Sequence, residues 1–212
     1  VLFVVADDLN CYIGAYGNEE VKTPNMDRLA TRGTLFTKAI CQFPVCGPSR
    51  ASFMTGLRPN TTGIISNGPS VFKKNQGVKT IPSEFKKQGY VTARTGKVYN
   101  GVDNSEASDW DFLLDAKVDM KKTKAAEGDV VDGGHKHWRS EWRKPDCEDN
   151  QLPDGANTEK VIEWMGTHKE DPFFLAVGFK KPHQPLISPK KYYDLYDKNK
   201  LRQAWAMYEK ED

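Results

Sequence analysis

The chain has 212 residues, of which 38% are hydrophobic, and its 31 basic and 29 acidic side chains leave a net charge of +2. This composition excludes a chain that is disordered as a whole, and the balanced charge gives no general argument for binding nucleic acid. No apolar run approaches the roughly 20 residues of a membrane-spanning helix, so we expect neither nucleic-acid nor membrane partners.

The first predicted element is a strand over Val1–Ala6, a continuous apolar run rich in β-branched residues. Such a run is typical of a central strand in a parallel sheet, buried on both faces. The strand ends at Asp7 and Asp8, and ligands of open α/β sheets lie beyond the carboxyl ends of strands. We therefore expect the acidic pair to meet a ligand, with a simple strand-to-loop cap as the alternative.

Two helices and a second strand follow. One helix is predicted from Thr23–Leu29 and another over Thr80–Gln88, because each begins at a capping residue or proline and stops near a glycine. A strand over Tyr90–Thr95 then delivers Lys97 to its end.

Residues 100–155 are polar and show no sustained period, so they predict a long surface insertion. Beyond it, a helix is predicted over Asn157–Met165, a buried strand over Pro172–Phe179 and a last helix over Leu201–Tyr208. Three strands that alternate with helices and end in polar residues favour an α/β fold with a largely parallel sheet and one active edge.

The segment around Cys46 is the most distinctive motif. It combines a Cys-x-Pro-x-Arg core, Cys46 to Arg50, with Thr55-Gly56 downstream. A thiol at the start of a helix can act as a nucleophile in cysteine phosphatases, but their phosphate cradle needs Cys-x5-Arg, and Arg50 comes only four residues after Cys46, with Pro48 between them. A buried structural cysteine is the other alternative. The four cysteines are too irregularly spaced for a disulfide framework or a tetrahedral zinc site.

This stretch resembles the signature of the formylglycine-dependent sulfatases, and residues 89–97 resemble their second signature. The resemblance implies an alkaline-phosphatase-like α/β fold, with a largely parallel sheet flanked by helices. It also implies that a formylglycine-generating enzyme oxidises Cys46 to an aldehyde. One hydroxyl of the aldehyde hydrate would attack sulfur, and the other would expel sulfate and restore the aldehyde.

The resemblance also implies a role for several other residues. Asp7 and Asp8 would bind Ca²⁺, with Mg²⁺ as a possible substitute, together with the modified Cys46. Arg50 would hold the hydrate, and Lys97 would contact both the formylglycine and the sulfate. Asn100 stands where family members commonly have a histidine base. Another base, acidification by the metal alone, or a local misalignment would each account for that difference.

The segment Phe179–Pro185 contains a Lys-Pro-His element that many sulfatases carry after the corresponding strand. The resemblance implies that His183 binds the anionic sulfate and protonates the leaving alcohol, and that Lys181 contacts the same sulfate. His135 and His137 lack acidic or thiol partners at a useful spacing, so we assign them no catalytic role.

Within the family, the chain looks most like iduronate-2-sulfatases and bacterial sulfatases of sulfated polysaccharides. The whole chain, 1–212, would be the N-terminal part of the catalytic domain, because the family's second pair of metal ligands and a further lysine lie downstream. The implied partners are a sulfated carbohydrate, the formylglycine-generating enzyme and the remaining C-terminal part. The implied compartment is extracellular, periplasmic or lysosome-like. A phosphate or phosphonate monoesterase of the same superfamily and a non-catalytic binder of sulfated glycans are the alternatives.

Overall fold

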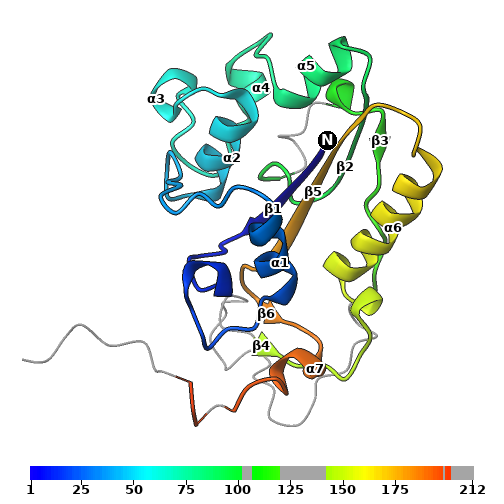
Figure 1. Cartoon of the computed structure of the whole chain (residues 1–212). Helices are drawn as coiled ribbons and strands as arrows, with labels where there is room; N and C mark the ends of the chain where they lie inside the picture. The colour runs from blue at the N-terminus through cyan, green and yellow to red at the C-terminus, as the bar shows by residue number, and fades with distance from the viewer. Residues whose placement is uncertain (102–106, 120–141, 198, 202–212) are drawn as a thin grey trace, which may run out of the picture.

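The computed structural model describes residues 1–101, 107–119, 142–197 and 199–201. These residues form a four-stranded sheet in the order β1-β5-β2-β3, in which all neighbouring strands are parallel (Figure 1). Its strands are β1 (Leu2–Asp7), β2 (Val91–Gly96), β3 (Phe112–Leu113) and β5 (Phe173–Pro182). A separate parallel pair joins β4 (Trp142–Arg143) to β6 (Leu186–Ile187). The predicted α/β fold with a largely parallel sheet is confirmed.

Short helices connect these strands. The α-helices are α1 (Pro24–Arg32), α2 (Cys46–Thr55), α3 (Pro59–Thr62), α4 (Val71–Lys74), α5 (Ile81–Lys87), α6 (Pro153–Thr167) and α7 (Lys190–Tyr193). The 3-10 turns are η1 (Gly14–Tyr16), η3 (Ala107–Asp109) and η6 (Asp149–Gln151). The predicted helices near residues 24–32 and 81–87 are confirmed, and each starts with proline in its first turn. From residue 202 onward the predicted C-terminal helix lies outside the described residues, as do the histidines at 135 and 137.

Strand β5 lies at the centre of the sheet and separates two hydrophobic clusters. Phe174 and Ala176 pack on one face with Met54 of α2, while Leu175 and Val177 pack on the other with Trp164 of α6. Successive side chains of a strand point to opposite faces, so the continuous apolar run of this strand fills both layers. The prediction of a buried strand at this position is confirmed.

Strand β1 is present as predicted, but within the described sheet it does not have the predicted central position. It is an edge strand in the described sheet, and Leu2 and Val4 are 48% and 53% exposed. Only its inner face is packed, where Phe3 meets the rings of Phe53 and Phe174. An apolar run shows that a strand can be covered on both faces, but it does not show what covers it.

The predicted surface segment 100–155 contains core residues that its polar composition hides. Strand β3 pairs with β2, and Trp110 just before it is 5% exposed and stacks near Phe174. The Asp109 side chain is buried and accepts a hydrogen bond from Thr80, the N-cap residue of α5. The segment 107–119 is therefore part of the sheet rather than a decoration on it. No helix among the described residues is long and apolar enough to cross a membrane.

Candidate active site

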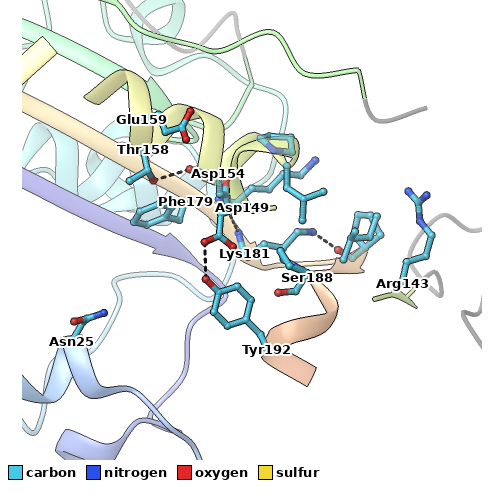
Figure 2. A pocket seen from close by; sticks show the side chains of 17 residues that line it. Asn25, Arg143, Asp149, Asp154, Thr158, Glu159, Phe179, Lys181, Ser188 and Tyr192 are labelled. Atoms are coloured by element: carbon cyan, nitrogen blue, oxygen red, sulfur yellow. Dashed lines mark hydrogen bonds between the residues drawn. The ribbon is translucent and has the colours of Figure 1, made fainter. Parts of the chain in front are cut away.

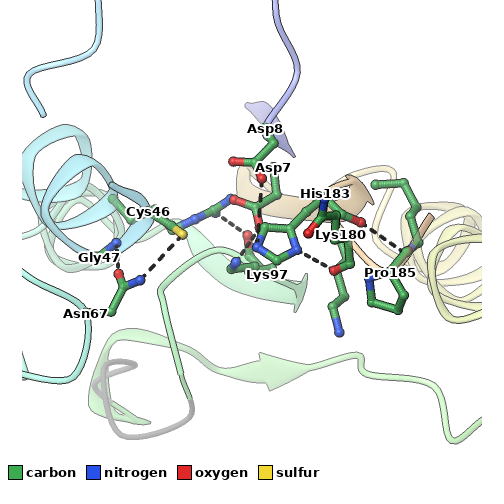
Figure 3. A network of polar contacts seen from close by, with 12 residues as sticks. Asp7, Asp8, Cys46, Gly47, Asn67, Lys97, Lys180, His183 and Pro185 are labelled. Atoms are coloured by element: carbon green, nitrogen blue, oxygen red, sulfur yellow. Dashed lines mark hydrogen bonds and ion pairs between the residues drawn. The ribbon is translucent and has the colours of Figure 1, made fainter. Parts of the chain in front are cut away.

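The polar ends of three strands meet the start of helix α2. Asp7 ends β1, Lys97 follows β2, and His183 follows β5, while Cys46 is the first residue of α2 (Figure 3). Within the described chain, donor atoms of Asp7, Cys46 and His183 all lie within 4.8 Å of one another. Cys46 and His183 are 137 positions apart in the sequence. The structure brings them together at the sheet edge where the sequence predicts a ligand.

Asp7 is the buried centre of this group. Its side chain accepts a 2.8 Å hydrogen bond from Arg50 and another from the ammonium of Lys97, and the residue is only 3% exposed. Burial by itself would raise the pKa of Asp7, but the hydrogen bonds from Lys97 and Arg50 outweigh burial and hold that pKa below its ordinary value. Asp7 is therefore an ionised carboxylate at neutral pH.

Arg50 connects helix α2 to the sheet. Besides Asp7, its guanidinium donates to the main-chain carbonyl of Val98 at 3.0 Å and to that of Lys97. A planar group with several fixed donors can satisfy a carboxylate and two carbonyls at once, which a lysine cannot do in the same geometry. Arg50 therefore fixes the distance between the start of α2 and the end of β2.

Lys97 reaches Asp7 because the main chain turns sharply at two paired glycines. Gly96 has a φ of +67°, and a Cβ there would lie 2.1 Å from the carbonyl oxygen of Gly178 on β5. The Gly96 N–H donates to Asp115 at 2.7 Å, and the Lys97 N–H donates to the Gly178 carbonyl at 2.8 Å. The glycine pair thus allows the main chain that follows β2 to pass over β5 at Gly178 and present Lys97 to the site.

Cys46 lies half-buried at the first position of α2, after an extended Val45 that provides no side-chain cap. Its sulfur is 3.9 Å from Nδ2 of Asn67, and the Asn67 oxygen accepts the Gly47 N–H at 2.8 Å. Asn67 was not among the residues predicted from sequence. The signal available there was a Ser-Asn-Gly turn motif at residues 66–68, which says nothing about a long-range contact.

His183 faces the acidic pair from the loop after β5. Its main-chain N–H donates to the Asp7 carbonyl at 3.1 Å, and its Nε2 lies 3.9 Å from Asp7 Oδ2 and 3.8 Å from Asp8 Oδ2. The Asp8 side chain is 61% exposed, and its main chain has a φ of +62°, a left-handed conformation that costs energy in a non-glycine residue. This turn directs the second carboxylate toward the same open side as the imidazole (Figure 3).

Lys181 does not contact Asp7 in this structure. Its ammonium donates to the carbonyl of His183 at 3.1 Å and to that of Pro185, so it ties together the loop that carries the imidazole. The same side chain lines a cavity of about 850 Å³ beside the loop, which Figure 2 shows. The walls of this cavity are Asn25, Arg143, Asp149, Leu152, Pro153, Asp154, Gly155, Thr158, Glu159, Phe179, Lys180, Lys181, Pro185, Ile187, Ser188, Pro189 and Tyr192.

The donor chemistry fits a hard divalent cation in part. Asp7 and Asp8 supply carboxylate oxygens, which Ca²⁺ and Mg²⁺ prefer, whereas the thiol of Cys46 is a soft ligand better suited to other metals. An oxygen at position 46 would add a third oxygen donor to those of the two carboxylates. Asn100 lines a small cavity together with Gly47, so it lies beside the start of α2.

Residues 1–208 match the family described as Sulfatase. The chain is similar to mouse iduronate 2-sulfatase, with 37% identity over 207 residues that cover 92% of this chain and 37% of that protein. It is also similar to a sulfatase from Formosa agariphila, with 36% identity over 92% of this chain and 41% of that protein. The chain therefore spans well under half the length of these curated relatives.

Solved structures with low identity share the fold. The phosphonate monoester hydrolase of Agrobacterium radiobacter aligns with a TM-score of 0.71 and 20% identity, over 92% of this chain and 43% of its own. A protein solved in complex with its substrate D-glucosamine-2-N,6-O-disulfate aligns with a TM-score of 0.69 and 22% identity, over 97% of this chain and 39% of its own.

Proposed function

Because this chain belongs to the sulfatase family, we propose that it is the N-terminal part of an enzyme that hydrolyses sulfate esters of a sulfated sugar, with formylglycine formed from Cys46. The observation that carries the proposal is the meeting of Cys46, Asp7 and His183 within 4.8 Å. It supports the proposal because a nucleophile position, a carboxylate for a cation and a proton carrier are the parts that sulfate transfer needs.

The modified side chain would supply a hydrated aldehyde as the nucleophile, and Ca²⁺ would neutralise charge on the sulfate oxygens. Asp7 and Asp8 would hold the cation together with the oxygen at position 46. The lowered pKa of Asp7 supports this role, because a carboxylate that is ionised at neutral pH needs no proton released before it binds a cation.

The basic side chains divide into a structural and a substrate-facing group in this proposal. Arg50, which is buried and fully engaged, keeps residue 46 aligned with Asp7. Lys97, whose side chain is 19% exposed at the edge of the site, meets the sulfate. Both would also offset the negative charge that gathers when a sulfate approaches two carboxylates.

His183 is the proposed general acid that protonates the leaving alcohol. It lies beside the carboxylates, and an imidazole can carry and release a proton at physiological pH. Because Asn100 cannot accept a proton at neutral pH, we assign Asp8, the more exposed carboxylate, as the group that accepts the proton of the hydrate, and a bound cation would make that hydroxyl more acidic.

The rest of the saccharide would extend into the cavity beside the His183 loop. Its wall combines the Tyr192 ring with cations such as Arg143 and Lys180 and with the carboxylates Asp149, Asp154 and Glu159, a mixture that offers a sugar an aromatic surface and many hydrogen-bonding groups. Lys181 lines this cavity, so its proposed contact with substrate would be made there. Similarity to iduronate 2-sulfatase supports a sulfated carbohydrate as the substrate class.

A further part of the catalytic domain would complete the site and cover β1. The exposed edge of β1, with Leu2 and Val4 open to solvent, supports such a partner because an unpaired apolar edge is an open pairing surface. The remaining cation ligands would come from this part, since two carboxylates and one oxygen leave Ca²⁺ short of its usual six to eight ligands. A secreted, periplasmic or lysosome-like location completes the proposal.

The test is sulfate release by the full-length protein from a panel of sulfated sugars, with matched phosphate and phosphonate monoesters. We expect turnover of sulfate esters by the protein matured with a formylglycine-generating enzyme, and none by Cys46→Ala. Faster turnover of phosphate or phosphonate esters would replace the sulfatase activity by that of a related hydrolase. Binding of sulfated glycans without turnover of any ester would contradict an enzymatic role.

A further inference from the structure

Asn67 faces residue 46 from the segment between α3 and α4, and the proposed catalytic residues do not include it. Both the oxygen and the nitrogen of its side-chain amide contact the start of α2. The oxygen Oδ1 accepts the main-chain N–H of Gly47 at 2.8 Å, and Nδ2 lies 3.9 Å from the sulfur of Cys46. One amide therefore bridges the helix start and its first side chain.

The contact with Gly47 decides which end of the amide faces Cys46. A main-chain N–H is only a donor, so the atom that accepts from it must be the amide oxygen. The NH₂ group is then the end turned to residue 46, as Figure 3 shows. Asn67 thus presents a hydrogen-bond donor to whatever group the side chain of residue 46 carries.

This approach depends on the absence of a side chain at Gly47. A Cβ there would lie 2.8 Å from Oδ1 of Asn67, closer than real Cβ atoms come, and 3.2 Å from the carbonyl oxygen of Ser66, which is a tight contact. Because Val45 makes no side-chain cap, Asn67 also supplies the acceptor that the first turn of α2 lacks. The loop is therefore held against the helix start by a specific contact.

The sulfur of Cys46 lies between Asn67 and the carboxylate of Asp7 in Figure 3. A group attached at residue 46 would thus have an ionised acceptor on one side and a neutral donor on the other. Oxygen accepts an N–H hydrogen bond far better than sulfur does, so replacing the thiol by an oxygen-bearing group strengthens the contact with Nδ2.

We propose that Asn67 is a further residue of the active site, whose Nδ2 donates a hydrogen bond to an oxygen carried by the modified side chain at position 46 and holds that side chain toward Asp7 and His183. This inference rests on the proposed function. It assigns Asn67 two separable tasks, capping α2 through its oxygen and contacting the reacting group through its nitrogen.

Asn67→Asp separates the two tasks. It keeps the oxygen that accepts from Gly47, and it replaces the donor by a second oxygen of nearly the same shape. Ser66→Asp is the matched control, because it adds the same charge at the neighbouring exposed position and leaves the amide in place. Both variants are expected to unfold in urea at the same midpoint as the unchanged protein, since the cap is retained.

The first readout uses the full chain before maturation, in buffer with a chelator, and needs no sulfatase activity. The rate at which iodoacetamide alkylates Cys46 is followed by peptide mass spectrometry, because the exposed Cys11 and Cys41 also react. The thiolate is the reacting species, and a donated N–H stabilises it. We expect about a tenfold slower reaction in Asn67→Asp, the effect of losing one hydrogen bond to a charged group, and less than about a threefold change in Ser66→Asp.

The second readout is turnover of a sulfate ester by the matured full-length protein. We expect kcat to fall at least about tenfold in Asn67→Asp, with KM changed less, because the lost contact is to the nucleophile rather than to the substrate. Alkylation of Cys46 at the unchanged rate in Asn67→Asp, or equal slowing in both variants, would overturn the inference. A matured protein without sulfatase activity would instead refute the proposed function, while the alkylation rates still decide on Asn67.

Discussion

At the scale of single residues, the buried ion pair between Arg50 and Asp7 organises the site. Both side chains are 4% exposed, and the guanidinium also holds two main-chain carbonyls. If one side chain were removed, buried as the pair is, water could not take its place as a hydrogen-bond partner of the other. The pair therefore makes position 46 and the end of β1 one rigid unit, and its loss leaves an unpaired charge inside the protein.

Arg50→Ala should lower the free energy of unfolding by about 3–5 kcal/mol, because it removes one partner of a buried pair. Arg32→Ala, at an exposed position in the last turn of α1, is the control and should change that free energy by less than about 1 kcal/mol. Urea unfolding followed by circular dichroism measures both. A small loss for Arg50→Ala would mean that the pair does not organise the site.

Asp7 gives a pH dependence with a defined sign. Its folded-state pKa lies below its value in the unfolded chain, so its ionised form stabilises the fold above pH about 4, and this contribution is lost as pH falls through the lowered pKa. We expect the difference in unfolding free energy between the unchanged protein and Asp7→Asn to be constant above pH about 5 and to shrink below pH about 4.

The measurement is urea unfolding between pH about 2.5 and 7 with a chelator present, so that no cation contributes. Asp171→Asn, at an exposed position after α6, is the control and should retain the pH dependence of the unchanged protein. A difference between Asp7→Asn and the unchanged protein that does not vary with pH would show that Asp7 is not held ionised by Lys97 and Arg50.

At the scale of elements, the main chain that follows β2 passes over β5 and thereby places Lys97. Gly96 and Gly178 are paired in register, and a Cβ on Gly178 would lie 2.2 Å from the main chain of Lys97. The segment after β2 therefore lies closer to β5 than a side chain at position 178 would permit. The position of the lysine is set by this backbone crossing as much as by its own ion pair.

Gly178→Ala should destabilise the fold by about 1–3 kcal/mol, since the added methyl group has no space to enter. Gly166→Ala, near the end of α6 where a Cβ meets nothing within 4 Å, should instead stabilise it by about 0.5–1 kcal/mol through better helix propensity. Opposite signs in urea unfolding are the expected result. Two substitutions of equal effect would contradict the close crossing.

The local sequence pattern predicted the helices correctly where capping residues and prolines mark their first turns. Examples are Thr80 at the start of α5 and the proline that opens α1. It was insufficient for β3, because a two-residue strand inside a polar segment has no period to detect. The apolar residues Trp110 and Phe112 to Leu114 were the available signal, interrupted by Asp111. Helix α6 starts at Pro153, earlier than predicted, because Gly155 weakens the helical pattern yet must be small to lie against the Asp149 carbonyl.

For the site as well, the sequence predicted which residues come together at the sheet edge but not the contacts that depend on loop folding. The predicted residues Asp7, Cys46, Lys97 and His183 come together because parallel strands end at one edge of the sheet. Lys181 binds main-chain carbonyls instead of reaching Asp7, and Asn67 reaches Cys46 through a loop. No local pattern encodes either contact, because each depends on how a loop folds back.

At the scale of the whole molecule, the exposed edge of β1 is the main feature that the described residues leave unexplained. Leu2 and Val4 face solvent beside a strand that carries the central carboxylate at its end. A family relative is more than twice as long as this chain, which covers 37% of it. We therefore expect the edge to be covered in the full-length protein.

Val4→Lys tests that expectation by comparing two lengths of the protein. In the 212-residue chain it should change the unfolding free energy by less than about 0.5 kcal/mol, since the site is exposed. In the full-length protein it should cost more than about 2 kcal/mol, because the charge would be buried without a partner. Ile162→Lys, on the exposed side of α6, should be neutral in both. Equal effects of Val4→Lys in the two lengths would mean that nothing covers β1.

The most direct measurement is mass spectrometry of the peptide that contains residue 46, isolated from the full-length protein after co-expression with a formylglycine-generating enzyme. The account predicts a loss of about 18 Da at Cys46, the change from CH₂SH to CHO, in the same sample that releases sulfate from a sulfated sugar. An unmodified cysteine at position 46 in a sample that still hydrolyses sulfate esters would contradict the formylglycine mechanism, and an unmodified cysteine without activity would leave only a glycan-binding role.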